Sequence, residues 1–187
     1  MANIIDAIVE NLISGFSQIL SSFTKDPSIW WLLAPIILFW LVIEIYFGRY
    51  KNEKLGWNTA LGNGLSMFWV VVISLKTLFD ENLNLYSTEK LVFIIFIALY
   101  STFIILISFT HKIKDNLFFL IASPTIVYFL SLIAILWIND LLVIDLWVAL
   151  DLIILYLIIV VIESVLKKLI PAASEEKKHT ELKLGRI

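Results

Sequence analysis

The chain of 187 residues contains no cysteine, only two histidines and few charged residues, which make up 16% of the sequence. The lack of cysteine excludes disulfides, thiolate metal sites and a cysteine nucleophile. His111 and His179 offer little for a histidine-based metal or acid–base site. Because 14 Lys and Arg are balanced by 16 Asp and Glu, the chain also lacks the positive charge of nucleic-acid-binding proteins. We expect no nucleic acid partner.

Enzyme motifs are missing as well. The sequence contains no HExxH, no GxSxG, no phosphate-binding loop and no Asp-rich pattern for metal-bound diphosphate chemistry. We therefore expect no catalytic activity, no cofactor and no metal ion.

Apolar residues, in contrast, are abundant. They make up 60% of the chain, and the mean hydropathy is +0.95. A soluble domain of this length cannot bury that much apolar surface. The lipid bilayer is therefore the expected surrounding.

Five stretches are long and apolar enough to cross a membrane as helices, which needs about 20 residues each. They are Ser28–Gly48, Gly56–Phe79, Thr88–Thr110, Leu117–Ile138 and Leu146–Leu169. The connections between them are short and polar. The predicted fold is an all-α integral membrane bundle of five helices over residues 26–170, preceded by an amphipathic helix over 1–25 and followed by a charged tail over 171–187.

Positive charge predicts the orientation, because Lys and Arg stay on the cytoplasmic side. Most of them flank the same ends of the five spans: Arg49, Lys51, Lys54, Lys112, Lys114, Lys167, Lys168, and Lys177, Lys178, Lys183 and Arg186 of the tail. Only Lys25, Lys76 and Lys90 fall on the other side. We expect the N-terminus outside and the C-terminus in the cytoplasm.

The first 23 residues form one apolar and one polar face at helical spacing. Ile5, Val9, Phe16 and other large apolar residues recur every three or four positions, and acidic and amide residues fill the opposite face. This pattern predicts a helix that lies in the membrane interface or against the bundle.

Several polar residues lie inside the predicted spans near the cytoplasmic boundary. They are Glu44, Asn58, Thr59, Asn63, His111 and Glu163. Both glutamates lie four residues, or about 6 Å, inside the boundary. Ionisable groups in a membrane cost about 2.5–3.5 kcal/mol on insertion scales, so each needs a reason. If the helices face each other suitably, these residues form one polar layer, a candidate ion or proton site.

A purely structural role is the alternative for these residues. Glu163 precedes Lys167 by one helical turn, which favours a local ion pair, and Glu44 is close enough to the edge to reach Arg49 or lipid headgroups. Asp151 lies about 8 Å from the outer end of the fifth span. We expect it to pair with Lys76 or Lys90, or with a partner chain.

Two spans carry potential helix breaks at similar depths. Gly62-Asn63-Gly64 lies in the second span and Ser123-Pro124-Thr125 in the fourth. Interrupted helices at matching depths can mark a transporter's binding site, although membrane helices carry Gly and Pro routinely.

Three function classes remain open from the sequence. We expect a structural or accessory subunit of a membrane complex, with other membrane subunits as partners. The alternative is a small homo-oligomeric ion or solute channel or transporter that uses the polar inner-leaflet layer. A membrane enzyme is the third class, and it has the least support because no motif points to it.

Overall fold

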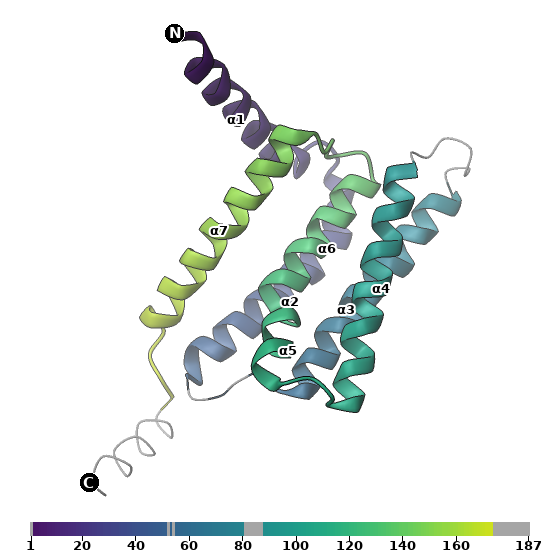
Figure 1. Ribbon diagram of the computed structural model, residues 1–187, viewed down its shortest axis with the longest axis vertical. Helices are drawn as coiled ribbons and strands as arrows, with labels where there is room; N and C mark the ends of the chain where they lie inside the picture. The colour runs from purple at the N-terminus through teal and green to yellow at the C-terminus, as the bar shows by residue number, and fades with distance from the viewer. Residues whose placement is uncertain (1, 52, 54, 81–87, 174–187) are drawn as a thin grey trace, which may run out of the picture.

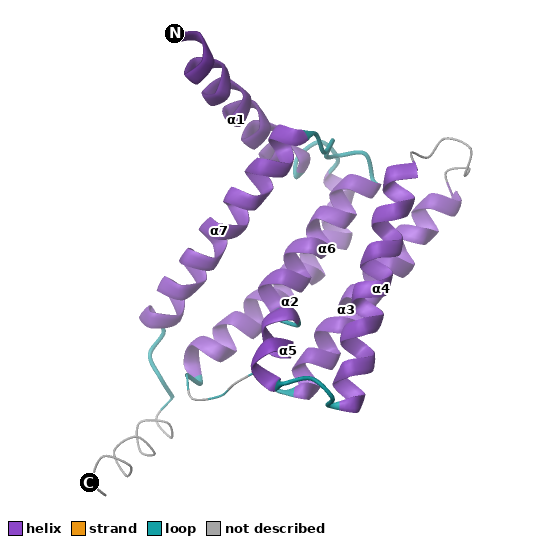
Figure 2. Cartoon of the chain, viewed as in Figure 1, coloured by secondary structure: helices purple, strands orange, loops and turns teal. Residues whose placement is uncertain are grey.

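The computed structural model describes residues 2–51, 53, 55–80 and 88–173, and every regular element in these ranges is helical (Figures 1 and 2). The chain begins with α1 (Ala2–Ser22) and the short helix η1 (Pro27–Ile29). The spans that follow are α2 (Trp30–Arg49), α3 (Trp57–Asp80), α4 (Thr88–Thr110), α5 (Asp115–Ile121) with α6 (Pro124–Ile138), and α7 (Leu146–Leu169). The predicted tail lies outside the described residues from position 174 onward.

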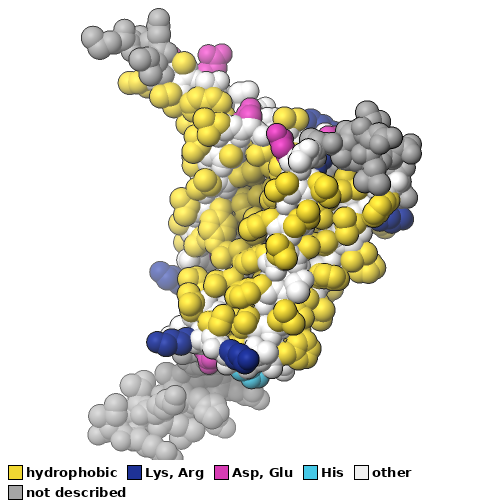
Figure 3. All heavy atoms as spheres, turned by 45° about the vertical axis from the view of Figure 1, so that its right-hand side comes forward, with side chains coloured by type: hydrophobic (Ala, Val, Ile, Leu, Met, Phe, Trp, Pro, Cys, Tyr) yellow, Lys and Arg dark blue, Asp and Glu magenta, His cyan; other side chains and the backbone are white. Residues whose placement is uncertain are grey.

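The described residues contain five helices or helix pairs long and apolar enough to cross a membrane, at the five predicted positions. Their boundaries differ from the predicted ones by only a few residues. The predicted all-α membrane bundle is therefore confirmed. Hydrophobic side chains cover the face of the bundle seen in Figure 3 between its two ends, as expected for a surface that faces lipid.

The α6 helix is the centre of the bundle. Of an apolar 18-residue stretch in the span formed by α5 and α6, 67% is buried. The corresponding share is 17% in the spans of α2 and α7. One apolar core joins α6 to α1, α2 and α7, and a second joins α5 and α6 to α3 and α4. The helix α7 thus lies at the edge of the bundle, where it contacts α1 and α2 (Figure 1).

A proline divides the fourth span into α5 and α6. Ser123 is extended and its hydroxyl accepts from the Ile126 N–H, while Pro124 occupies the first turn of α6, where its missing N–H costs nothing. Gly62-Asn63-Gly64 has no such effect, since α3 continues through it without a break. Only one of the two potential breaks therefore exists.

The helix α1 packs on α7 through a narrow contact. Gly15, Ile19 and Ser22 are buried there, and the N-terminal half of α1 extends past the bundle (Figure 1). A row of apolar residues beside this contact remains exposed, and we call it the α1 stripe: Ile5, Val9, Ile13 and Leu20. The amphipathic helix is present as predicted; its placement in the membrane interface stays a prediction.

The two ends of the bundle differ in character. One end, which we call the basic end, holds the last turn of α2 with Arg49, the first turn of α3, the 111–114 connection and the last turn of α7 with Lys167 and Lys168. The opposite end, which we call the α1 end, includes Asp26.

The Asp26 carboxylate accepts hydrogen bonds from the hydroxyl and from the backbone N–H of Ser28, both at 2.8 Å. These bonds lower the pKa of Asp26 below its usual value.

Candidate functional site

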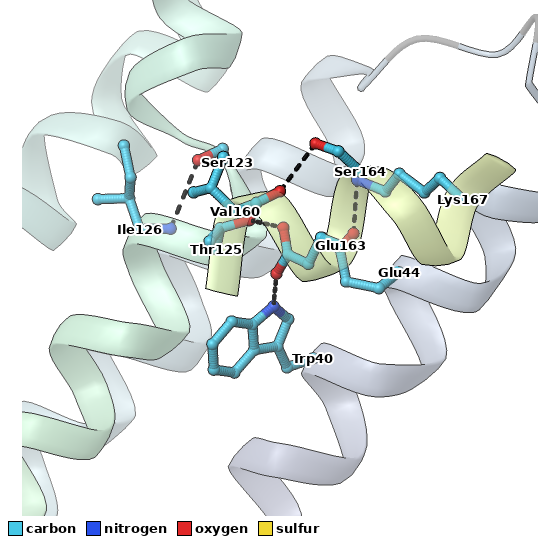
Figure 4. A network of polar contacts seen from close by, with 9 residues as sticks. All are labelled: Trp40, Glu44, Ser123, Thr125, Ile126, Val160, Glu163, Ser164 and Lys167. Carbon is cyan, nitrogen blue, oxygen red and sulfur yellow. Dashed lines mark hydrogen bonds and ion pairs between the residues drawn. The ribbon is translucent and has the colours of Figure 1, made fainter. Parts of the chain in front are cut away.

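Glu163 of α7 connects three helices near the basic end (Figure 4). Trp40 Nε1 of α2 donates to Glu163 Oε1 at 2.9 Å, and Thr125 Oγ1 of α6 donates to Oε2 at 2.7 Å. Thr125 is placed there by the proline break, which starts α6 at this depth. Hydrogen bonds between membrane helices average about 0.6 kcal/mol, so these two bonds mainly fix the position of α7.

Glu44 of α2 forms an ion pair with Lys167 of α7 at 2.5 Å (Figure 4). The expected alternatives, a pair between Glu163 and Lys167 or one between Glu44 and Arg49, are not formed. The reason is tertiary: α2 and α7 lie side by side, so the Lys167 ammonium reaches the neighbouring helix rather than its own preceding turn. The exposed fractions are 39% for the Lys167 side chain and 12% for Glu44.

Asn63 of α3 belongs to a separate network at the α5–α6 break. Its Nδ2 donates to the Ala122 carbonyl at 2.9 Å, and its Oδ1 accepts from the Tyr128 hydroxyl at 3.3 Å. Tyr100 of α4 donates to the Ile121 carbonyl at 2.7 Å. Because α5 ends here, both carbonyls lack the helical partners they would have in a continuous helix. Asn63 and Tyr100 supply donors that the surrounding apolar side chains cannot.

Asn58, Thr59 and His111 line an open cavity of about 540 Å³ at the basic end. The His111 ring lies against Trp57, with 4.3 Å between ring centroids, and Trp57 stacks in turn on Phe118. Tyr46 donates to Glu53 on the same cavity wall at 2.5 Å. The predicted layer is thus divided in three. Glu44 and Glu163 lie between α2, α6 and α7, and Asn63 lies at the helix break. The remaining members, Asn58, Thr59 and His111, lie at the basic end of the bundle.

Asp151 of α7 lies at the contact with α1, near the α1 end, without the partner we expected. Lys90 pairs with Asp140 instead, at 2.5 Å, and Lys76 is exposed. Asp151 is fully buried, and neither carboxylate oxygen has a hydrogen-bond partner among the described residues. Gly15 of α1 covers it so closely that a Cβ on Gly15 would lie 2.0 Å from Asp151 Oδ2. The expectation of a Lys76 or Lys90 partner was therefore wrong, and a contact of Asp151 with a partner chain stays a prediction.

Three contributors to these contacts were missed at the sequence level: Trp40, Thr125 and Gly15. Trp40 lies near the middle of its span, where an indole N–H must find an acceptor inside the protein; this was the available signal. Thr125 carried a similar signal through its place beside Pro124. Gly15 had none, because its role depends on which residue of α7 faces it.

Within the described ranges, no group of three or more His, Asp or Glu side chains could hold a metal ion. Glu44, Glu163 and Lys167 instead join neighbouring helices. Comparisons of the chain with protein-family models, with curated proteins and with solved structures give no match.

Proposed function

We propose that this protein is a non-catalytic subunit of a membrane complex and that it binds its partner through the α1 stripe. The observation that carries the proposal is the exposure of this stripe, with Ile5 at 70%, Ile13 at 65% and Leu20 at 68%. An apolar row on a helix that projects from the bundle is typical of a protein or membrane contact. The narrow contact of α1 with α7 leaves this row free.

The polar residues inside the bundle support the same proposal. Glu163, Glu44 and Asn63 each bind a residue on another helix, so their side chains position helices. Intramembrane charges more often mark a substrate or ion pathway. Here the contacts with neighbouring helices account for these three residues without a substrate or ion pathway, which favours a structural role.

The homo-oligomeric channel is the alternative. It would place the small and polar residues of α3 on the axis between copies. In the single chain Asn63, Ser74 and Gly64 are buried, and a Cβ on Gly64 would lie 2.9 Å from Ile104 Cγ2 of α4. These residues are buried by other helices of the same chain, so they do not face a second copy, and no specific observation favours the channel.

We also propose that the N-terminus lies outside and the C-terminus in the cytoplasm. The distribution of Lys and Arg supports this orientation, because the basic end holds most of the positive charge of the connections between spans.

The test is purification of the particle in mild detergent, with measurement of its mass and chain composition. We expect unlike chains to be present in a fixed ratio. A photo-crosslinking residue in place of Ile13 should form an adduct with one of them, whereas one in place of Ser14, on the polar face of α1, should not.

Substitution on the two faces sharpens this experiment. Ile13→Glu should reduce the recovered partner by about tenfold, the loss of roughly 1.4 kcal/mol of binding, while Ser14→Glu should retain it. A particle containing only copies of this chain would contradict the proposal and favour the channel. Equal recovery with both variants would show that the α1 stripe is not the contact.

A further inference from the structure

Two acidic or basic residues lie at least one turn inside the spans and have no polar partner in the described ranges. Asp151 of α7 is fully buried, with neither carboxyl oxygen bonded. Lys76 of α3 is exposed on the surface of the bundle and forms no hydrogen bond or ion pair with a described residue. Buried polar groups in native proteins are nearly always satisfied. The two residues have opposite charges, so each could supply the partner that the other lacks.

Both residues lie near the α1 end at a similar depth. Asp151 is five residues, or about 8 Å, from the start of α7, and Lys76 is four residues, or about 6 Å, from the end of α3. Within one chain they do not meet, because α7 contacts α1 and α2 at one edge of the bundle and α3 contacts α4 and α6 at the opposite edge (Figure 1). A second copy of the chain can bring them together.

Each of the two residues continues into a row of exposed apolar side chains along its own helix. The row on α7 consists of Ile154, Ile158 and Val161, and the row on α3 consists of Val72, Trp69 and Leu65. In both rows the steps are three and four residues, which keeps the side chains on one face of the helix. This spacing is the one by which neighbouring helices pack side by side.

The two rows match when the helices are antiparallel. Starting from the α1 end, α7 is followed in the direction of increasing residue number and α3 in the direction of decreasing number. With Lys76 opposite Asp151, the facing pairs are Val72 with Ile154, Trp69 with Ile158, and Leu65 with Val161. Apolar burial contributes little to helix association in lipid, where close packing and polar contacts decide it. An ion pair between the two helices would therefore set their register.

We propose that Asp151 forms an ion pair with Lys76 of a second copy of this chain, and that the two exposed rows pack against each other beside it. The Lys76 ammonium stands on a flexible four-carbon stem, which lets it reach across to the neighbouring helix. The contact is head to tail, because every copy carries both rows and uses a different one towards each neighbour.

The cover over Asp151 lies at the edge of the contact between α1 and α7. Gly15 covers the carboxyl group, and none of residues 5–14 of α1 is buried. On the C-terminal side Ile19 is buried, and Lys25 donates to a backbone carbonyl of the connection between α6 and α7 at 2.8 Å. The turn around Gly15 therefore moves aside when the copies pack, while the rest of α1 stays attached.

The first experiment is native mass spectrometry of the purified chain in mild detergent over a range of concentrations. We expect the copies to associate, and we expect Lys76→Glu to raise the dissociation constant between copies by about thirtyfold or more, the usual effect of breaking a buried charge pair. Lys76→Arg should retain the association. Lys112→Glu, which changes an exposed lysine of the basic end, is the control and should have no effect.

A double substitution tests whether the two residues act together. Asp151→Asn should weaken association in the unchanged chain and should have no further effect in the Lys76→Glu chain, as expected for two residues of one pair. If Asp151→Asn does not fold, the Lys76 variants still decide the question, because that side chain is exposed in the single chain.

Cross-linking tests the register of the two rows. Chains with Trp69→Cys mixed with chains with Ile158→Cys should form a disulfide-linked dimer on oxidation, and the chain has no other cysteine to react. Leu157→Cys is the matched control for Ile158→Cys. It is exposed at nearly the same depth, but it points about 100° away around α7, so it should not cross-link.

Three results would each overturn the inference: single copies at every concentration, unchanged association in Lys76→Glu, or equal cross-linking at positions 157 and 158. The inference is independent of the proposed function. One copy bound to an unlike chain would retain the proposed function and overturn the ion pair. Copies joined through Asp151 and Lys76 without an unlike chain would do the reverse.

Discussion

Gly15 and Asp151 depend on each other at the contact between α1 and α7. A carboxyl group without partners is costly to bury. The space for the Asp151 carboxyl group exists because the residue above it, Gly15, has no side chain. The backbone of Gly15 lies in a regular helix, so its small size, and not its conformational freedom, is what this position requires. The pair thus determines where α1 can attach.

Gly15→Ala is expected to displace α1 from α7. In a helix the change from Gly to Ala normally stabilises by about 0.5–1 kcal/mol, but here the new Cβ would lie 2.0 Å from Asp151 Oδ2. The natural absence of cysteine allows two spin labels to be attached through Glu10→Cys and Leu150→Cys. The distance between the labels should become longer or its distribution broader in the Gly15→Ala protein.

Gly62→Ala is the matched control for this measurement. A Cβ on Gly62 meets nothing within 4 Å, so the label distance should not change and the protein should be as stable as before or more so. An unchanged distance in Gly15→Ala would show that the contact tolerates a methyl group and that Asp151 does not fix α1.

The Asp26 carboxyl is expected to titrate below its usual value of 3.8, because the Ser28 hydroxyl and then the Ser28 backbone N–H stabilise its charged form. Its contribution to the fold at the start of η1 is therefore present above the usual pKa and lost as the pH falls through the lower pKa of the folded protein. Titration followed by the carboxyl carbon NMR signal measures it. Ser28→Ala should move the midpoint back towards 3.8; a midpoint already at 3.8 in the unchanged protein would refute the prediction.

At the scale of helices, the proline break in the fourth span organises its neighbours. The Pro124 break leaves the Ile121 and Ala122 carbonyls inside the membrane without helical partners, and Tyr100 and Asn63 donate to them from α4 and α3. A break that is costly in isolation thus becomes the point where three spans are joined. This explains why a polar residue as costly as Asn63 lies deep in a membrane helix.

Asn63→Leu is expected to destabilise the protein by about 1–3 kcal/mol, the cost of a buried acceptor that has lost its donor. Asn58→Leu is the control, since Asn58 is an exposed residue of the same helix and surface changes usually stay within about 0.5 kcal/mol. Equilibrium unfolding in a denaturing detergent measures both. If the two variants were equally stable, the Asn63 bond to Ala122 would contribute nothing to the fold.

At the scale of the whole molecule, α7 is attached at its two ends by different means. At the basic end Glu163 and Lys167 bind side chains of α2 and α6, and at the α1 end Asp151 meets Gly15. Between these points α7 is largely exposed.

The proposed orientation predicts which end of the bundle faces the outside. In intact cells, a membrane-impermeant thiol reagent should label Thr24→Cys, at the α1 end, and should label Lys112→Cys, at the basic end, only after the membrane is opened. The chain has no other cysteine to react. Labelling of Lys112→Cys in intact cells would reverse the orientation.

Much of the fold was predictable from hydropathy. The five spans, the helical N-terminus and the polar connections follow from the number of consecutive apolar residues and from the need of backbone groups in a membrane to bond within their own helix. The candidate layer was only partly predictable. Glu44 and Glu163 do lie in one network, but Asn63 and His111 belong to other parts of the bundle.

The sequence by itself determined which segments cross the membrane, because hydrophobic length and helical hydrogen bonding are local properties of the chain. Only the tertiary structure decided which polar groups meet. Lys167 has Glu163 one turn before it, yet it pairs with Glu44, and Asp151 lies under Gly15 rather than beside a lysine. These pairings depend on the rotation and neighbours of each helix, which are set by close packing between side chains far apart in the sequence.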